Sequence, residues 1–347
     1  MSERNTIGSR LISRVIETRD RETLASLFAI DARSLVAVRI GLATILLYDS
    51  IASLSSPGGG ALALFASIAV LPFACALLVG FKTRWMTAIC WLIYGLPIRQ
   101  GLLDPGVSVF LGRYVLALFL FWSMFLPLAR HLSVDARTSP RRPSLILSIG
   151  SAAALIQLFW IYFSAGINKH FGEWIFEASA MQDVLRTGFA NELGHRVAEA
   201  DGLMAIVSIA TIVLEVIGSI LLFVPGKRLP ERRLLLVGAF VVFHIGMATF
   251  MNLGIFPFVM ITVWLLFLPA KTWDRLTRHQ LEHPVETDRN LLRNLTAGAA
   301  MVYVIVSNYI TWAFYPADSG FAGQWQQVGV ILLLYQQWAM FSIPSTL

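Results

Sequence analysis

The chain has 347 residues, of which 56% are hydrophobic and only 14% are charged, and its mean hydropathy is +0.68. Soluble domains carry about 25% charged residues, so this chain has too few charges to cover a surface that faces water. The net charge of +6 does not indicate a nucleic-acid partner, because the basic residues stand in short segments between apolar runs. Composition therefore predicts an integral membrane protein whose main partner is the lipid bilayer.

The N-terminal 30 residues are charged and lack the apolar core of a secretory signal peptide. Apolar residues such as Leu11, Val15 and Leu24 recur at roughly helical spacing, and arginines stand between them. This pattern is typical of a helix that lies in the membrane interface. We expect residues 1–30 to form an amphipathic helix on the cytoplasmic surface.

Long apolar runs dominate the rest of the chain. A helix needs about 20 mostly apolar residues to cross a bilayer. We expect nine such helices, at residues 34–54, 61–81, 83–101, 107–129, 144–168, 203–224, 234–251, 253–270 and 291–314. The runs are unbroken and show no period-2 alternation, which argues against membrane-spanning strands.

The predicted fold class is therefore all-α. We expect one polytopic integral membrane helical bundle over residues 31–347, with about nine transmembrane helices plus the N-terminal interfacial helix. A tenth apolar run, 327–343, is interrupted by Gln336 and Gln337 and could span the membrane, re-enter it or lie at the interface.

The distribution of Lys and Arg gives the predicted orientation. With the N-terminus in the cytoplasm, the cytoplasmic segments hold 21 of these residues and the outer segments hold 4, while Arg39 and Arg113 lie inside spans. We therefore predict a multi-pass protein of the plasma (inner) membrane with a cytoplasmic N-terminus. One outer segment, 169–202, is long and charged in both signs, so we expect any functional face to lie there.

Five ionisable residues fall inside the predicted spans: Arg39, Asp49, Arg113, Glu215 and His244. A charge at the bilayer centre costs at least about 2.5–3.5 kcal/mol on insertion scales, so each of them needs a partner or a water-filled cavity. Depth predicts that Asp49 pairs with Arg113 and that Glu215 pairs with His244, whereas Arg39 reaches the cytoplasmic headgroups. The two pairs either lock helices together or surround a polar cavity that opens outward.

Lys169 stands where the fifth predicted span leaves the membrane on the outer side. Glu173 follows four residues later and could pair with it, and Trp174 is expected to anchor the chain at the interface. A partly desolvated lysine loses its proton more readily and can serve as a base. The alternative is a lysine that simply extends from the membrane edge toward water.

Metal binding is not predicted. Cys75 and Cys90 lie within apolar runs, where small packing residues are the better interpretation. His279 and His283 have i,i+4 spacing in a predicted cytoplasmic loop, but a solvated loop explains them better than a metal site.

The segment around Lys169 resembles the vitamin K-dependent γ-carboxylase superfamily and its bacterial relatives, the horizontally transferred transmembrane (HTTM) domain proteins. The family pattern of Tyr-Phe, Ala-Gly, Lys and Trp is matched by Tyr162-Phe163, Ala165-Gly166, Lys169 and Trp174. Further matching stretches extend the resemblance over residues 31–343; they begin at Asp31, Phe125, Ser133, Asn252 and Gln337, with Arg39, Glu215 and His244 between them.

This resemblance implies a chemical role for Lys169. In the carboxylases the matching lysine is regarded as the base that deprotonates reduced vitamin K, and oxygenation then produces a strong base that acts on a glutamate side chain. Lys169 would accordingly act on reduced vitamin K or another lipid quinone, with Glu215 and His244 as further catalytic candidates. The residues expected to shape the cavity are Asp49, Arg113, Tyr162, Glu173, Trp174 and Asn252.

Three departures argue against glutamate carboxylation itself. The Asn-His pair that the carboxylases have before the fourth span is missing from residues 104–113. The sequence ends at Leu347 without their large soluble region, and Ala178 stands where many relatives have Gly. Whether the chain is an enzyme therefore stays open. The alternative is a non-enzymatic membrane factor for maturation or export of a secreted peptide or protein, which segment 169–202 would bind.

Overall fold

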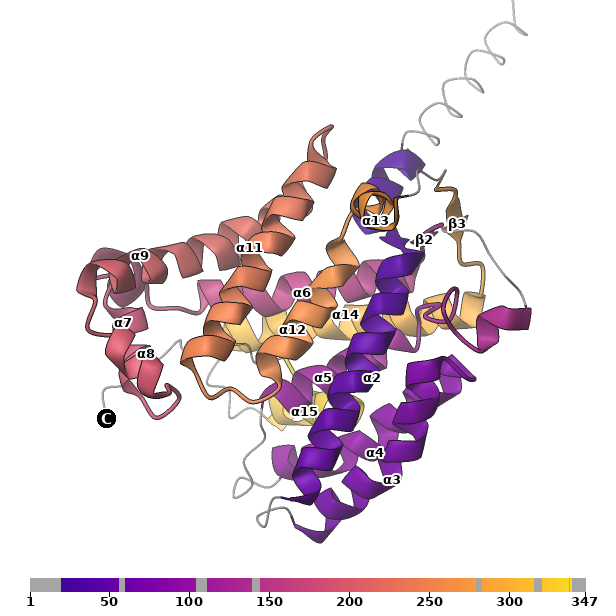
Figure 1. Cartoon of the computed structure of the whole chain (residues 1–347), viewed down its shortest axis with the longest axis horizontal. Coiled ribbons are helices and arrows are strands. Elements are labelled where there is room, and N and C mark those ends of the chain that lie inside the picture. The colour runs from indigo at the N-terminus through magenta and orange to yellow at the C-terminus, as the bar shows by residue number, and fades with distance from the viewer. Residues whose placement is uncertain are drawn as a thin grey trace, which may run out of the picture.

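The structure, a computed structural model, describes residues 20–55, 60–103, 111–138, 144–278, 283–314, 320–336 and 338. It is a helical bundle with one very small sheet (Figure 1). Of the interfacial helix expected over residues 1–30, residues 20–28 are helical and residues 1–19 lie outside the described part. Residues 104–110, His279 and Gln337 also lie outside it.

Three consecutive antiparallel helices form one side of the bundle. They are α2 (Ala32–Leu54), α3 (Ala61–Val79) and α4 (Thr83–Leu103), and each is long and apolar enough to cross a membrane. Asp31 caps the start of helix α2, because its side chain accepts a hydrogen bond from the backbone N–H of Arg33. Helix α3 turns apolar side chains outward, and Phe65 among them is 60% exposed. Lipid rather than water suits such a face.

The centre of the bundle is built from α5 (Leu111–Ser123) and α6 (Ile149–Ile167). Every side chain of α5 from Tyr114 to Ser123 is buried, which fits a helix that is apolar on all sides. Only 13 residues of the predicted fourth span, 107–129, are helical in the described part, because the chain turns after Ser123. Helix α6 begins with a capping box between Ser148 and Ser151.

The following helices cover α6. Helix α9 (Asp201–Ile212), the π-helical turn η3 (Val213–Gly218) and the short α10 (Ser219–Leu221) together form one apolar span. Helix α11 (Leu229–Phe250) is a further span. Within the described residues, six helices meet the length and composition of a membrane span, so the nine expected spans are matched only in part.

The eighth predicted span, 253–270, is shorter than expected. Helix α12 (Phe256–Trp264) continues into the 3-10 turn η4 (Leu265–Phe267), and the chain then bends by 101° into α13 (Ala270–Thr277). The bend falls at Leu268-Pro269, where proline cannot continue the helix.

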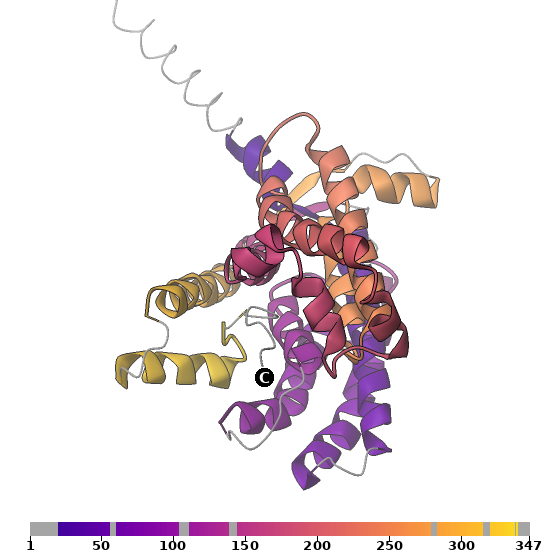
Figure 2. The same ribbon diagram turned by 90° about the vertical axis from the view of Figure 1, so that its left-hand side faces the viewer.

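The C-terminal part contains α14 (Leu291–Phe314), which packs on α6, and α15 (Gly320–Leu332). Figure 2 shows α15 folded back beside α14. The tenth apolar run is predicted at 327–343, but the helix there begins earlier, at Gly320, and ends at Leu332. The next residue, Leu333, has a left-handed φ of +53°, which turns the chain back into the bundle.

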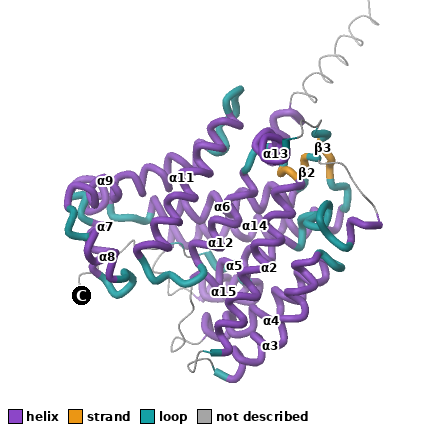
Figure 3. Tube along the Cα trace, in the orientation of Figure 1, coloured by secondary structure: helices purple, strands orange, loops and turns teal. Residues whose placement is uncertain are grey.

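Three short strands gather the starts of three helices at one end of the bundle. Strands β1 (Ile30–Asp31), β2 (Leu145–Leu147) and β3 (Val285–Thr287) form a sheet in that order. Strand β2 pairs antiparallel with β1 and parallel with β3. The strands precede α2, α6 and α14, so the N-terminal ends of these helices lie on the same side (Figure 3).

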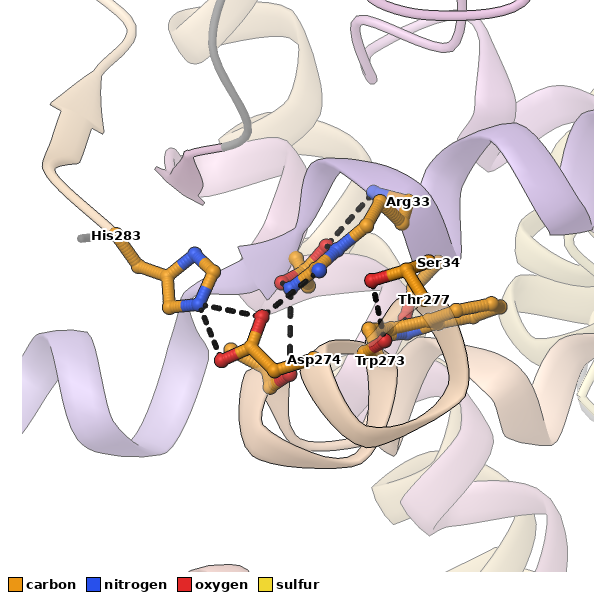
Figure 4. Close-up of polar contacts among 8 residues, drawn as sticks. Arg33, Ser34, Trp273, Asp274, Thr277 and His283 are labelled. Atoms are coloured by element: carbon orange, nitrogen blue, oxygen red, sulfur yellow. Dashed lines mark hydrogen bonds and ion pairs between the residues drawn. The ribbon is translucent and has the colours of Figure 1, made fainter. Parts of the chain in front are cut away.

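A polar cluster joins α13 to the start of α2 at this end (Figure 4). Arg33 donates to Asp274 at 2.9 Å, and His283 lies 2.9 Å from the same carboxylate. The indole N–H of Trp273 donates to Ser34 at 2.8 Å. His283, one of the two residues with a metal-like spacing, is thus a partner of a carboxylate.

At the other end, segment 169–202 forms the π-helical turn η2 (Gly172–Phe176), α7 (Ala180–Arg186) and α8 (Glu192–Val197). It rests on the turn between α11 and α12, where Ala190 and Met251 form an isolated β-bridge. The backbone N–H of Asn252 also donates to the carbonyl oxygen of Phe189 at 2.7 Å.

The expected position of Arg39 is wrong. Its side chain is buried and donates to the carbonyl oxygens of Leu132 at 2.5 Å and Leu128 at 3.4 Å. The turn that follows α5 supplies these acceptors inside the bundle. The guanidinium is therefore hydrogen-bonded within the protein and does not extend to the lipid headgroups. Gly80 ends α3 with a φ of +73°, and a Cβ there would collide with Arg39.

Asp135, in the 3-10 turn η1 (Asp135–Thr138), caps the start of α4. Its carboxylate accepts from the backbone N–H groups of Lys82 and Thr83 at 2.8 and 2.9 Å. Partial burial alone would raise the pKa of Asp135, but these hydrogen bonds and the charge of Arg39 outweigh it and lower the pKa below the ordinary 3.8.

We expect Asp135→Ala to destabilise the protein by about 1 kcal/mol at neutral pH, because α4 loses its charged cap. Since the folded-state pKa is lowered, the stabilisation is complete above about pH 3.8 and is lost as the pH falls through the lowered pKa. Thermal unfolding of both proteins in detergent between pH 3 and 7 should therefore show a gap that closes in acid. A gap of constant size would contradict this account.

Candidate functional site

Lys169 lies buried just after the end of α6. Its ammonium nitrogen is 2.7 Å from Oε2 of Glu215, and the two side chains are only 1% and 2% exposed. The same nitrogen also donates to the carbonyl oxygen of Ala165 at 3.3 Å. Two opposite charges at this distance in an apolar surrounding stabilise each other strongly, which offsets part of the cost of burying them.

Local backbone features bring the two side chains together. Gly166 lies against η3, where a Cβ would come within 2.6 Å of Val216 and 3.1 Å of Glu215. Only glycine allows this close approach of α6. Glu215 itself stands in the π-helical turn η3, and such turns are frequent at functional sites.

A second π-helical turn, η2, places Trp174 over Lys169. The indole is 1% exposed, and the ammonium lies 4.8 Å from its ring centroid. Trp174 is therefore not the interfacial anchor that its position suggested, because η2 folds it inward. Ala178, shortly after η2, has a φ of +53°, a conformation that glycine adopts more easily.

Two expected partnerships are wrong. Lys169 reaches Glu215 rather than Glu173, which is half-exposed on η2. Glu215 does not bond to His244, whose two ring nitrogens bond to Tyr162 and Phe240. The i,i+4 rule for Lys169 and Glu173 fails because the chain leaves α-helical geometry at residue 168.

His244 instead belongs to a chain of buried hydrogen bonds. Its Nδ1–H donates to the carbonyl of Phe240 at 2.7 Å, so Nε2 accepts from the hydroxyl of Tyr162 at 3.0 Å. The Tyr162 oxygen in turn accepts from the indole N–H of Trp264 at 2.8 Å. Both ring nitrogens of His244 are satisfied, which suits a residue that holds helices together.

The expected pair of Asp49 and Arg113 is confirmed. Nε of Arg113 lies 3.0 Å from Asp49 Oδ2, and it connects α5 with α2. The hydroxyl of Tyr94 on α4 donates to the same carboxylate at 2.8 Å, and Arg113 also donates to Ser53 at 2.6 Å. None of these bonds involves Lys169 or Glu215.

Asn252 is exposed beside segment 169–202, and its side chain donates to the carbonyl of Ala190 at 3.4 Å.

Sequence reasoning missed a buried amide cluster around Gln336. Its side chain exchanges hydrogen bonds with Gln157 on α6 at 3.0 and 3.3 Å, and its oxygen accepts from the indole of Trp338 at 2.7 Å. The backbone carbonyl oxygen of Trp338 accepts a hydrogen bond from the side-chain amide of Asn168, which is next to Lys169. The amides that interrupt the last apolar run were the available signal, because an amide in hydrocarbon needs a partner.

The family model of the HTTM domain matches residues 29–273, which include α2 to α12 and both Lys169 and Glu215. The chain belongs to the HTTM domain family. Comparison with curated proteins and with solved structures gave no match. The HTTM domain is a membrane domain, so this chain is a multi-pass membrane protein built around a buried lysine–glutamate pair.

A double-mutant cycle tests that pair. We expect Lys169→Met and Glu215→Leu each to destabilise the HTTM domain by about 3 kcal/mol, because each leaves a buried charge without its main counter-charge. The double variant should be more stable than either single variant. Thermal unfolding in detergent measures all four proteins. Additive losses would mean that the two charges do not stabilise each other.

Proposed function

We propose that this HTTM protein uses Lys169 as a base toward a lipid-soluble quinol. The observation that carries the proposal is the contact of 2.7 Å between the buried amine and Glu215. A surface lysine at the membrane edge would need no such partner. The resemblance of the Tyr162–Trp174 stretch to the carboxylases supports the same role.

Glu215 decides whether Lys169 can accept a proton. A lysine ammonium is not a base, but along a short hydrogen bond its proton can pass to the carboxylate. The products are a neutral amine and a carboxylic acid, and burial favours neutral groups over charged ones. The amine then takes the proton from a ligand hydroxyl, and Glu215 serves as the proton store.

The residues around Lys169 suit a quinol by their chemistry. A bound quinol supplies an aromatic hydroxyl that is more acidic than water, and a neutral amine next to it accepts that proton. Apolar and aromatic side chains such as Trp174 suit its ring. We assign His244 and Tyr162 to positioning, because their hydrogen bonds to Phe240 and Trp264 are already made within the bundle.

Lys169→Arg separates a base from a structural cation. Arginine keeps a positive charge beside Glu215 but does not give up its proton in proteins. The purified full-length protein in nanodiscs would be mixed anaerobically with 2-methyl-1,4-naphthohydroquinone, and the absorbance of the bound quinolate anion recorded. We expect the quinolate signal with the parent and its loss in Lys169→Arg.

Arg33→Gln is the control, because it removes a partly buried, paired charge at the end of the bundle that carries the sheet. It should keep the quinolate signal. Thermal unfolding shows whether each variant folds, and Lys169→Met combined with Glu215→Leu replaces Lys169→Arg if the arginine does not fit. If a folded Lys169→Arg protein gave the full quinolate signal, Lys169 would not be the base that deprotonates the quinol.

We also infer that the protein crosses the plasma (inner) membrane nine times with its N-terminus in the cytoplasm, residues 1–30 lying on that surface. The sheet supports this count, because the first, fifth and ninth predicted spans all begin beside it. If an odd number of the predicted spans between any two of these three did not cross, their starts would lie on opposite sides of the membrane. The excess of Lys and Arg marks the side of the sheet as cytoplasmic.

Cysteine labelling checks the orientation. In a protein whose Cys75 and Cys90 are replaced by Ala, His195→Cys in α8 should react with a membrane-impermeant maleimide in intact cells. Lys271→Cys in α13 should react only after the membrane is opened. The reverse pattern would place Lys169 on the cytoplasmic side.

A partner-binding role is the second candidate. Segment 169–202 exposes apolar side chains, with Phe176 at 84% and Phe189 at 55%, next to the exposed Arg186, Glu192 and His195. Such a surface suits a secreted peptide or protein. This role gains support if Lys169→Arg is functional in cells while Phe176→Ser combined with Phe189→Ser is not.

A further inference from the structure

A cavity of about 340 Å³ lies at the end of the bundle that carries the sheet, far along the chain from Lys169. It is enclosed by the helix at residues 20–28, the start of α11 and the bend between η4 and α13. Figure 1 places the start of α11 and α13 at this same end. The site proposed above uses none of its residues.

Arg233 is the buried charge of this cavity. Its guanidinium donates to the carbonyl oxygens of Leu222, Ser26 and Leu27, and it lies over the ring of Phe267. All these partners are neutral, and no carboxylate pairs with Arg233 in the described part of the chain. A buried cation without a counter-charge is costly, so an anion in the cavity would stabilise it.

Two lysines add to the positive charge. Lys227 and Lys271 line the cavity, are exposed, and form no ion pair with the residues that the structure describes. Among the described residues that line the cavity, Asp31 is the only acidic one, and Arg33 neutralises it at 2.8 Å. Three cations against one neutralised carboxylate favour a ligand with at least one negative charge.

The remaining wall is apolar and includes Leu229, Leu266 and Phe267. Leu229 begins the candidate span α11, and Leu266 and Phe267 end the apolar helix α12–η4, so the cavity joins an apolar wall to a cationic rim. Basic pockets between transmembrane helices on the cytoplasmic side suit phospholipid headgroups. A free phosphate would use the cations but not the apolar wall.

We propose that this cavity binds the phosphate of an anionic phospholipid headgroup, held by Lys227 and Lys271 above the buried Arg233. The acyl chains lie along the apolar wall. This site is independent of the chemistry at Lys169 and would bind lipid whether or not the protein is an enzyme.

The test compares Lys227→Gln/Lys271→Gln with the control Lys82→Gln/Arg137→Gln. Both variants lose two exposed positive charges on the side of the bundle near the sheet, but only the first pair lines the cavity. The full-length proteins in mild detergent would be titrated with phosphatidylglycerol and with phosphatidylcholine, and retained lipid counted by native mass spectrometry. Inorganic phosphate would be added in a separate arm as a competitor.

We expect the parent and the control to retain phosphatidylglycerol in preference to phosphatidylcholine. The cavity variant should bind phosphatidylglycerol about tenfold more weakly or worse. Displacement of the lipid by phosphate would support recognition through the headgroup phosphate. Equal retention of both lipids, equal binding by the two variants, or binding of phosphate without any lipid would overturn the proposal, while thermal unfolding confirms that each variant is folded.

Discussion

A lysine ammonium and a glutamate carboxylate meet at 2.7 Å inside an apolar bundle, and the backbone on both sides of this contact is built around it. Neither charge tolerates hydrocarbon alone, so the backbone around them is shaped to bring them together. Gly166 lets α6 approach η3, the π-helical turn carries Glu215 toward α6, and η2 closes Trp174 over the amine. The two π-helical turns depart from a regular α-helix, and all three features serve the same contact.

The other buried polar groups follow the same physical logic with a different result. His244 and Tyr162 form a chain in which the bonds between α6, α11 and α12 are complete, and Gln336 draws the C-terminal segment into the bundle through Gln157. In lipid, helices gain little from burying apolar surface against one another, so such bonds and close packing hold the bundle together. The pair of Lys169 and Glu215 differs from these neutral chains because it joins a cation to a carboxylate.

Much of the architecture could be predicted from the sequence. Long apolar runs gave the helices α2, α3, α4, α6, α11 and α14 close to their observed bounds, because hydrocarbon accepts no other backbone of that length. The pair of Asp49 and Arg113 was also predictable from depth alone. The bend after α12 was less predictable. Pro269 indicated its position, but a proline at the end of an apolar run does not tell how far the chain turns.

Sequence alone was enough to identify a membrane bundle of the HTTM type, to place Lys169 at the end of a span and to show that buried charges need partners. The identity of those partners depends on the three-dimensional fold. Spacing rules assume regular helices, whereas the π-helical turns η2 and η3 rotate Trp174 and Glu215 toward Lys169 and away from the positions those rules give. The uncompensated charge of Arg233 likewise emerges only when the turn before α11, the helix at 20–28 and the bend before α13 meet in space.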